Sequence, residues 1–257
     1  MNAAPPSPVV PRAFGSGMVH IVRFNWPFYA VAIALVGVAV ALTARGPASG
    51  ATLAVAVIAA GAAWFVAASL VVSFWVYDGS DLYRWRWLER VALPRSGSFV
   101  QLQAGYDETS ASLRVRFPDA DWRLFDVFDS RRTIAPSLAR ARRSGPPPAT
   151  TESVPAAMLP LPDESVDAVL SLLAVHEVRD EVERHALARE VRRVLRSDGA
   201  WIVAEHLRDV ANLMAFGPGF FHFLPRRTWL ETFDSAGLRV ADEFRVTPFV
   251  TVFVVRR

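Results

Sequence analysis

The sequence predicts an α/β protein with a doubly wound, mostly parallel sheet and an antiparallel C-terminal edge, preceded by two transmembrane helices. The apolar excess of the chain sits almost wholly before residue 77, in two long uncharged runs. After residue 98, strand-like and helix-like segments alternate, which is typical of a parallel sheet covered on both faces. Two strand-like segments then close the chain, near enough to each other to pair antiparallel.

Composition narrows the class of protein. With 257 residues the chain has room for one ordinary domain and a smaller appendage. It has no cysteine, which excludes disulfides, thiolate metal sites and a cysteine nucleophile. All 28 basic residues are arginine, a bias that indicates a GC-rich genome rather than a function. The net charge of +3 is small and mixed in sign, so we expect no nucleic-acid partner.

The first part of the chain reads as a tail followed by a hairpin. Residues 1–25 are rich in proline and predict an irregular N-terminal tail. Residues 26–43 and 51–76 carry no charge, and about 20 apolar residues suffice for a helix to cross a bilayer. Because residues 44–50 form a turn of helix breakers, we predict a transmembrane helical hairpin over residues 26–76.

The arginines predict the orientation of this hairpin. Two precede it, Arg45 alone lies in the turn, and four follow within residues 84–95. The positive-inside rule then places both termini and the soluble domain in the cytoplasm, on a two-pass inner (cytoplasmic) membrane protein. A signal peptide or a pair of buried core helices are the alternative interpretations.

Residues 77–97 are expected to form an interfacial linker helix. Tyrosine, tryptophan and arginine alternate over residues 83–87, which favours rings in the lipid headgroups and guanidinium groups on phosphates. The soluble domain then occupies residues 98–257.

Periodicity predicts the elements of that domain. Residues 167–173 are a continuous apolar run, as expected of a strand buried on both faces. Residues 181–195 carry apolar side chains at helical spacing. The other predicted strands are 98–103, 122–127, 201–204, 239–246 and 249–255, and the other helices are 131–143 and 228–235. Ligands bind beyond the carboxyl ends of such strands, so chemistry is expected in the loops 104–110, 128–130, 174–178 and 205–224.

Three segments carry a family resemblance. Residues 159–169 (Leu-Pro-Leu-Pro-Asp-Glu-Ser-Val-Asp-Ala-Val), the helix and turn at 189–199, and Ala-Gly-Leu at 236–238 resemble class I S-adenosylmethionine (SAM)-dependent methyltransferases, in particular methyltransferase type 11-like domains. The resemblance covers roughly residues 98–257. It implies a Rossmann-like fold and SAM as the cofactor.

The glycine turn of that family is a variant here. The family has an acidic residue and then Gly-x-Gly-x-Gly after the first strand, whereas residues 100–110 keep only Gly105. The resemblance implies that Gly105 and Asp107 contact SAM, with Asp107 or Glu108 supplying a carboxylate for the methionine ammonium. Alternatively, Asp107 or Thr109 caps the next helix.

An acid after the second strand binds the cofactor ribose in the family. Asp126 and Asp129 both compete for this role, and Asp129 matches better because the helix that follows it resembles the family's. Capping of that helix is the alternative for the same aspartate.

Histidines follow the fourth and fifth strands. We expect His176 to act as a catalytic base on a hydroxyl acceptor. His206, His222 and Phe220 are expected to bind substrate. No His-x-x-x-His spacing is present, so no metal is expected, although imidazoles and carboxylates gather there. A salt-bridged loop network around Arg179 and Arg208 is the alternative.

The loop at residues 213–224 holds four phenylalanines around Gly-Pro-Gly. It predicts either a lid packed on its own domain or a surface that meets the bilayer, a lipid-like substrate or another membrane protein.

Two functions follow as hypotheses. One is SAM-dependent methyl transfer to a hydrophobic, membrane-associated small-molecule acceptor. The other is a pseudoenzyme, a catalytically inactive methyltransferase fold that serves as a structural or docking subunit of a larger membrane protein complex. The expected partners are membrane lipid, other membrane proteins and, for an active enzyme, the hydrophobic acceptor.

Overall fold

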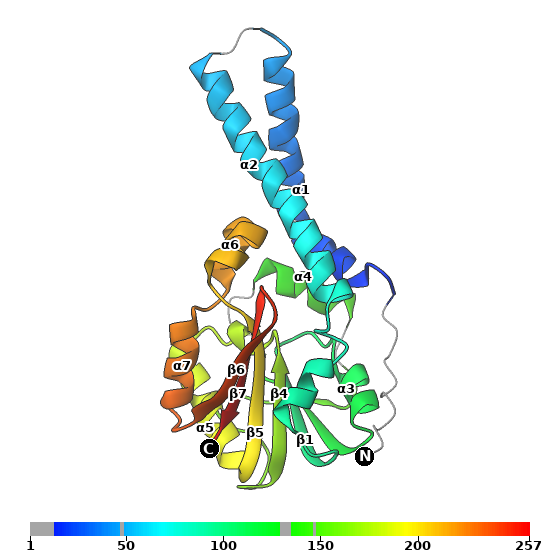
Figure 1. Ribbon diagram of the computed structural model, residues 1–257, viewed down its shortest axis with the longest axis vertical. Coiled ribbons are helices and arrows are strands. Elements are labelled where there is room, and N and C mark those ends of the chain that lie inside the picture. The colour runs from blue at the N-terminus through cyan, green and yellow to red at the C-terminus, as the bar shows by residue number, and fades with distance from the viewer. Residues whose placement is uncertain (1–12, 47–48, 129–134, 146–147) are drawn as a thin grey trace.

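A helical hairpin projects from an α/β domain (Figure 1). The computed structural model describes residues 13–46, 49–128, 135–145 and 148–257. The mostly parallel sheet with an antiparallel edge and the two apolar helices before it confirm the predicted fold class.

The hairpin consists of α1 (Ser16–Thr43) and α2 (Gly50–Ser73), which continues as the π-helix η1 (Phe74–Gly79). Both helices are long and apolar enough to cross a membrane, with mean hydropathies of 2.0 and 2.4. Only 17% of each apolar window is buried within the molecule, which is far less than a core helix would bury. The Tyr29 hydroxyl and Ser69 Oγ lie 2.8 Å apart and fix the alignment of the two helices.

The expected irregular tail is wrong for residues 16–25, because α1 begins at Ser16. Pro27 cannot donate to a carbonyl one turn back, and α1 kinks at Asn25, whose φ is −115°. The Asn25 side chain donates to the Ile21 carbonyl at 3.0 Å. The carboxylate of Asp78 accepts the free Gly17 and Met18 amides at 2.8 and 2.9 Å, so the end of η1 caps the start of α1.

The expected interfacial helix at residues 77–97 is also wrong. The π-helix ends at Gly79, and after a turn a 3₁₀ helix, η2 (Arg86–Val91), follows. Tyr83 and Trp85 are only 6% and 3% exposed and pack on one face of the sheet instead of reaching headgroups. Among the described residues, the short helix α3 (Ser110–Arg116) adds Leu113 to the buried cluster on that face, η1 adds Val76, and Val72 of α2 packs against it. The aromatic residues of this segment lie in the same cluster and help to cover the face.

The sheet has the order β3-β2-β1-β4-β5-β7-β6. Its first five strands are parallel, and β7 runs antiparallel to both of its neighbours. The strands are β1 (Ser96–Gln103), β2 (Asp119–Asp126), β3 (Thr151–Ser153), β4 (Val166–Leu172), β5 (Leu195–His206), β6 (Arg239–Thr247) and β7 (Val250–Arg256).

Helices α5 (Glu181–Val194) and α7 (Arg226–Asp234) cover the other face. Asp180 starts α5 by accepting the Glu183 amide at 3.0 Å. The remaining helices stand near the carboxyl ends of the strands: α4 (Pro136–Ser144), η3 (Val175–Glu177), α6 (Val210–Phe216) and η4 (Gly217–His222). The sequence indicated the start of α3 without its bounds, and it did not indicate β3 or α6; all three elements are short.

Candidate functional site

A cavity of about 200 Å³ lies at the carboxyl ends of β1 and β4. The strand order reverses between these two strands, and ligands of doubly wound sheets bind at such a point. His20 and Phe24 of α1 line the cavity from the hairpin side, and Leu138 and Ala141 of α4 line it as well. The sequence did not predict that α1 covers the cavity, because residues 1–25 were expected to be irregular.

The single glycine of the turn after β1 is covered by an arginine. Gly105 has a φ of +85°, a left-handed conformation that favours glycine. A Cβ there would lie 2.6 Å from the guanidinium of Arg142. Arg142 also lies 4.2 Å above the ring of Phe128. The face that the resemblance assigns to the cofactor is therefore occupied by Arg142.

Asp126 is the buried acid at the end of β2. One of its oxygens accepts the Gly105 amide at 2.7 Å and the Phe128 amide at 3.0 Å. The other accepts from Arg142 at 3.1 Å. A ribose diol would have to displace Arg142 to bind Asp126. Asp129, the expected ribose ligand, lies outside the described residues.

The two acids of the turn are engaged within the protein. Asp107 accepts the Thr109 and Ser110 amides at 3.0 and 2.9 Å, which confirms the capping interpretation. Glu108 accepts from the Tyr83 hydroxyl at 2.7 Å and lies 3.3 Å from His20 Nδ1. Glu108 thus connects this turn to α1 and to Tyr83.

Two glutamines near the end of β1 line the cavity and carry buried amide oxygens that can accept hydrogen bonds. Gln101 and Gln103 are each 3% exposed and line the cavity. Their amide nitrogens donate to Asp107 at 3.2 Å and to Thr151 at 3.1 Å. Within the described part of the chain, neither Oε1 atom has a hydrogen-bond partner. An unpaired buried acceptor costs about 1–3 kcal/mol, which a bound donor would offset.

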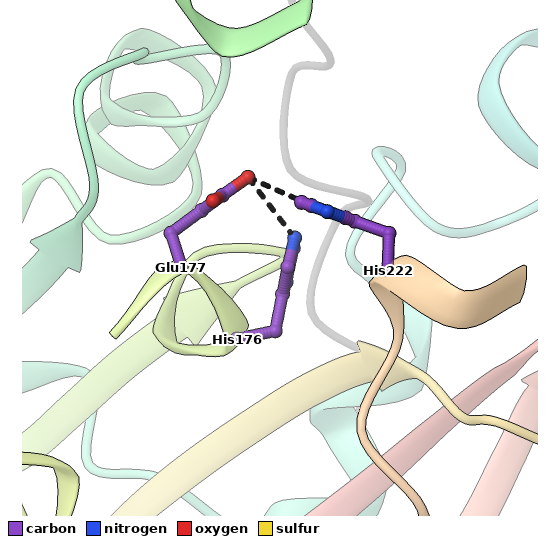
Figure 2. Close-up of side chains that lie close together, drawn as sticks. All are labelled: His176, Glu177 and His222. Carbon is purple, nitrogen blue, oxygen red and sulfur yellow. Dashed lines mark hydrogen bonds and ion pairs between the residues drawn. The ribbon is translucent and has the colours of Figure 1, made fainter. Parts of the chain in front are cut away.

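Figure 2 shows a cluster of His176, Glu177 and His222. His222 Nε2 lies 2.9 Å and His176 Nε2 3.5 Å from Glu177 Oε1. His176 and Glu177 belong to η3 and line the cavity, whereas His222 belongs to η4. Forty-five residues separate Glu177 from His222, so no local spacing could signal the cluster.

A buried carboxylate holds His176 from behind. Glu205 of β5 is 0% exposed and lies 2.7 Å from His176 Nδ1. Burial opposes the imidazolium, but the Glu205 and Glu177 carboxylates outweigh it and raise the pKa of His176 to about 10. An imidazolium has no free lone pair, so in this state His176 donates a hydrogen bond and does not act as the expected base.

The cluster has the composition of a cation site. Its three ligand atoms lie within 4.8 Å of one another. However, an Arg179 N–H faces His222 Nδ1, and an arginine only donates, so the ring proton of His222 is assigned to Nε2, facing Glu177. Burial lowers the pKa of His222, against the pull of Glu177. A metal would have to displace this proton, the proton of His176 and Arg179, so the residues fit a hydrogen-bonded network better than a metal.

Of the three residues expected to bind substrate, His206 lines the cavity, and His222 and Phe220 do not. His206 lines the cavity, with Nδ1 2.8 Å from the Phe249 carbonyl and Nε2 2.9 Å from the Tyr77 hydroxyl. Because a carbonyl only accepts, Nδ1 carries the proton, and burial lowers the pKa of His206 to about 4. His222 does not line the cavity, but it contacts Glu177 and His176, which do. Phe220 does not line it, whereas Phe223 does and stacks on His206 at 4.9 Å.

Comparisons with known proteins point to one family. Residues 123–203 match the family described as a methyltransferase domain. No curated protein matches the chain in sequence.

Solved structures with a similar fold include three methyltransferases. A SAM-dependent methyltransferase from Aquifex aeolicus is 14% identical, with a TM-score of 0.46 over 65% of this chain and 86% of its own. An S-adenosylmethionine-dependent methyltransferase from Mesorhizobium loti is 21% identical, with a TM-score of 0.42 over 65% and 95%. A geranyl diphosphate C-methyltransferase from Streptomyces coelicolor is 13% identical, with a TM-score of 0.45 over 64% and 74%.

The strand order and the cavity at its switch point define a class I methyltransferase-like α/β domain. The match over residues 123–203 supports the resemblance to class I methyltransferases that the sequence shows.

Proposed function

We propose that this protein is a membrane-anchored, SAM-dependent methyltransferase that acts on a hydrophobic acceptor. One observation carries the proposal: the cavity lies at the β1–β4 switch point and is lined by Gln101 and Gln103, whose buried amide oxygens have no hydrogen-bond partner among the described residues. Acceptors placed there suit the ammonium group of an amino acid, which must donate. In this proposal the hairpin crosses the inner membrane, with the domain on the cytoplasmic side.

The residues around the cavity would divide the work. Gln101 and Gln103 would hold the amino-acid end of SAM, and Asp126 would accept from the ribose hydroxyls at the place that Arg142 occupies in this structure. SAM supplies an electrophilic methyl group when bound. The protein positions the acceptor in line with that group and excludes water, and such positioning provides most of the catalysis that a transfer of this kind needs.

Arg142 gives the sharpest test. Titration calorimetry of the full chain in lipid nanodiscs should show SAM binding, and Arg142→Ala should bind it at least several-fold more tightly, because the variant frees Asp126 and the Gly105 face. Arg143→Ala is the matched control, since Arg143 is an exposed neighbour on the same helix and should leave the affinity unchanged. No binding by either the native chain or Arg142→Ala would refute the proposal.

A second function, the inactive docking subunit, is favoured by a different observation. The acids that the resemblance offers to the cofactor among the described residues, Asp107, Glu108 and Asp126, all have partners inside the protein. This function requires that SAM fail to bind even without Arg142. Purification in mild detergent should then recover the chain together with other membrane proteins.

A further inference from the structure

The helix α6 exposes apolar side chains on its outward side, while its buried side holds Asn212, Ala215 and Phe216. Its inward side includes Asn212, which is 0% exposed and bonds Asp209 and the Phe249 carbonyl at 3.1 Å each. Its outward side carries Val210, Leu213 and Met214 at 75%, 42% and 54% exposure. These three positions are spaced i, i+3, i+4 and so share one face of the helix.

The exposed apolar surface continues into η4. Phe221 is 68% exposed, and residues 210–224 contain no aspartate, glutamate, lysine or arginine. Arg208, itself exposed, holds this segment by donating to the carbonyls of Phe221 and Phe223 at 2.8 Å each. A fixed, uncharged segment with outward apolar side chains needs an apolar partner.

Contacts with α2 place this segment beside the apolar helices of the hairpin. Trp64 Nε1 donates to the Met214 carbonyl at 3.2 Å. A Cβ on Gly217 would lie 3.0 Å from the ring of Phe65, so the turn between α6 and η4 is seated directly on α2. Figure 1 shows α6 at the edge of the domain from which the hairpin projects. The surface of α6 is therefore continuous with the exposed side of the hairpin.

The depth of this contact follows from helix geometry. A hydrocarbon core of about 30 Å takes about 20 helical residues, which from the start of α2 at Gly50 reaches Ser69. Trp64 lies five residues before Ser69, or about 7 Å inside the boundary, at about 1.5 Å per residue. Interfacial helices bury their apolar face by about 5–10 Å, which matches.

We infer that α6 and η4 form an interfacial membrane segment whose outward side chains lie in the acyl region of the leaflet nearest the domain. The inference rests on the proposed crossing of the membrane by the hairpin. The cavity would then open beside the leaflet, because Phe223 and His206 line it directly behind this segment. The acceptor class is accordingly an amphiphile, with its reactive polar end in the cavity and its chain in the bilayer.

The absence of cysteine permits a direct measurement of depth. Single cysteines at Met214 and Phe221 would carry an environment-sensitive fluorophore in the full chain, reconstituted into phosphatidylcholine–phosphatidylglycerol vesicles with nitroxide-labelled lipids. Val38, 52% exposed in the second half of the first apolar run, reports on the span, and Val182, 73% exposed on α5, reports on water. All four side chains are exposed, so the substitutions should be tolerated.

The outcomes separate the two proposals. We expect nitroxides at shallow acyl positions to quench Met214→Cys and Phe221→Cys, nitroxides on the acyl chains to quench Val38→Cys, and neither to quench Val182→Cys. Quenching at Val38 without quenching at Met214 and Phe221 would overturn the interfacial segment and leave the anchor intact. Loss of quenching at Val38 would instead overturn the anchor.

Discussion

At the residue scale, the proton on His176 links the site to stability. Its pKa is raised from 6.5 to about 10, so the ion pair with Glu205 contributes fully below pH 6.5 and is lost as the pH rises toward 10. The native thermal midpoint should therefore fall between pH 7 and pH 10.

Substituting Glu205 tests this linkage. Glu205→Gln removes the carboxylate that does most to keep His176 charged, leaving a buried imidazolium short of one partner. We expect a loss of about 3 kcal/mol at pH 7, and a fall of the His176 pKa that moves the loss of stability to lower pH. Differential scanning fluorimetry across pH and the NMR titration of His176 would measure both. Glu181→Gln, on exposed α5 surface, is the control, and identical profiles for the native chain and Glu205→Gln would contradict the assignment.

The sequence anticipated only part of this site. It placed Gly105, Asp107, His176 and His206 at the carboxyl edge of the sheet, because each follows a recognisable strand. It missed the pairing of Glu177 with His222, since contacts between distant loops leave no spacing pattern. It also did not indicate Arg142, whose role depends on how α4 packs over Gly105.

At the element scale, one carboxylate joins the two ends of the hairpin. Asp78 accepts both Gly17 and Met18 amides, and Gly15 at the N-cap position offers no side-chain cap. Asp78→Ala should destabilise the protein by about 1 kcal/mol and loosen the first turn of α1.

Hydrogen exchange measures this loosening locally. The amides of Gly17 and Met18 should exchange faster in Asp78→Ala, whereas those of β4 should not change. Asp81→Ala is the matched control, because Asp81 pairs with Arg84 and Arg86 nearby on the surface. Equal protection of the two amides in Asp78→Ala and the native chain would show that the cap is not needed.

Elements were predictable where the pattern was long. The buried run in β4 and the amphipathic α5 agree with the structure to within about a residue of their expected bounds. The start of α1 and the conformation of residues 77–91 were not predictable from the sequence. Proline and alternating arginine obscured segments whose conformation is set by packing on the domain, through Asp78 and through the open face of the sheet.

At the scale of the whole molecule, the hairpin and the domain share one core. The sequence placed the start of the domain at residue 98, but Val76, Leu82 and Leu88 are at most 2% exposed against the sheet. Burial of each such side chain contributes about 1.5–3 kcal/mol. Together with Tyr83 and Trp85, they account for about 10 kcal/mol, which is comparable with the whole stability of an ordinary domain.

Truncation should therefore separate two fragments that the sequence alone would treat alike. A fragment of residues 74–257 keeps the segment that covers Phe99 and Ile202, and we expect it to unfold cooperatively. A fragment of residues 93–257 exposes that face of the sheet, so it should aggregate or bind an apolar dye such as ANS. A cooperative, dye-free 93–257 fragment would show that the cover is dispensable. Aggregation or dye binding by the 93–257 fragment would instead show that the end of the second apolar helix completes the fold of the domain as well as tethering it.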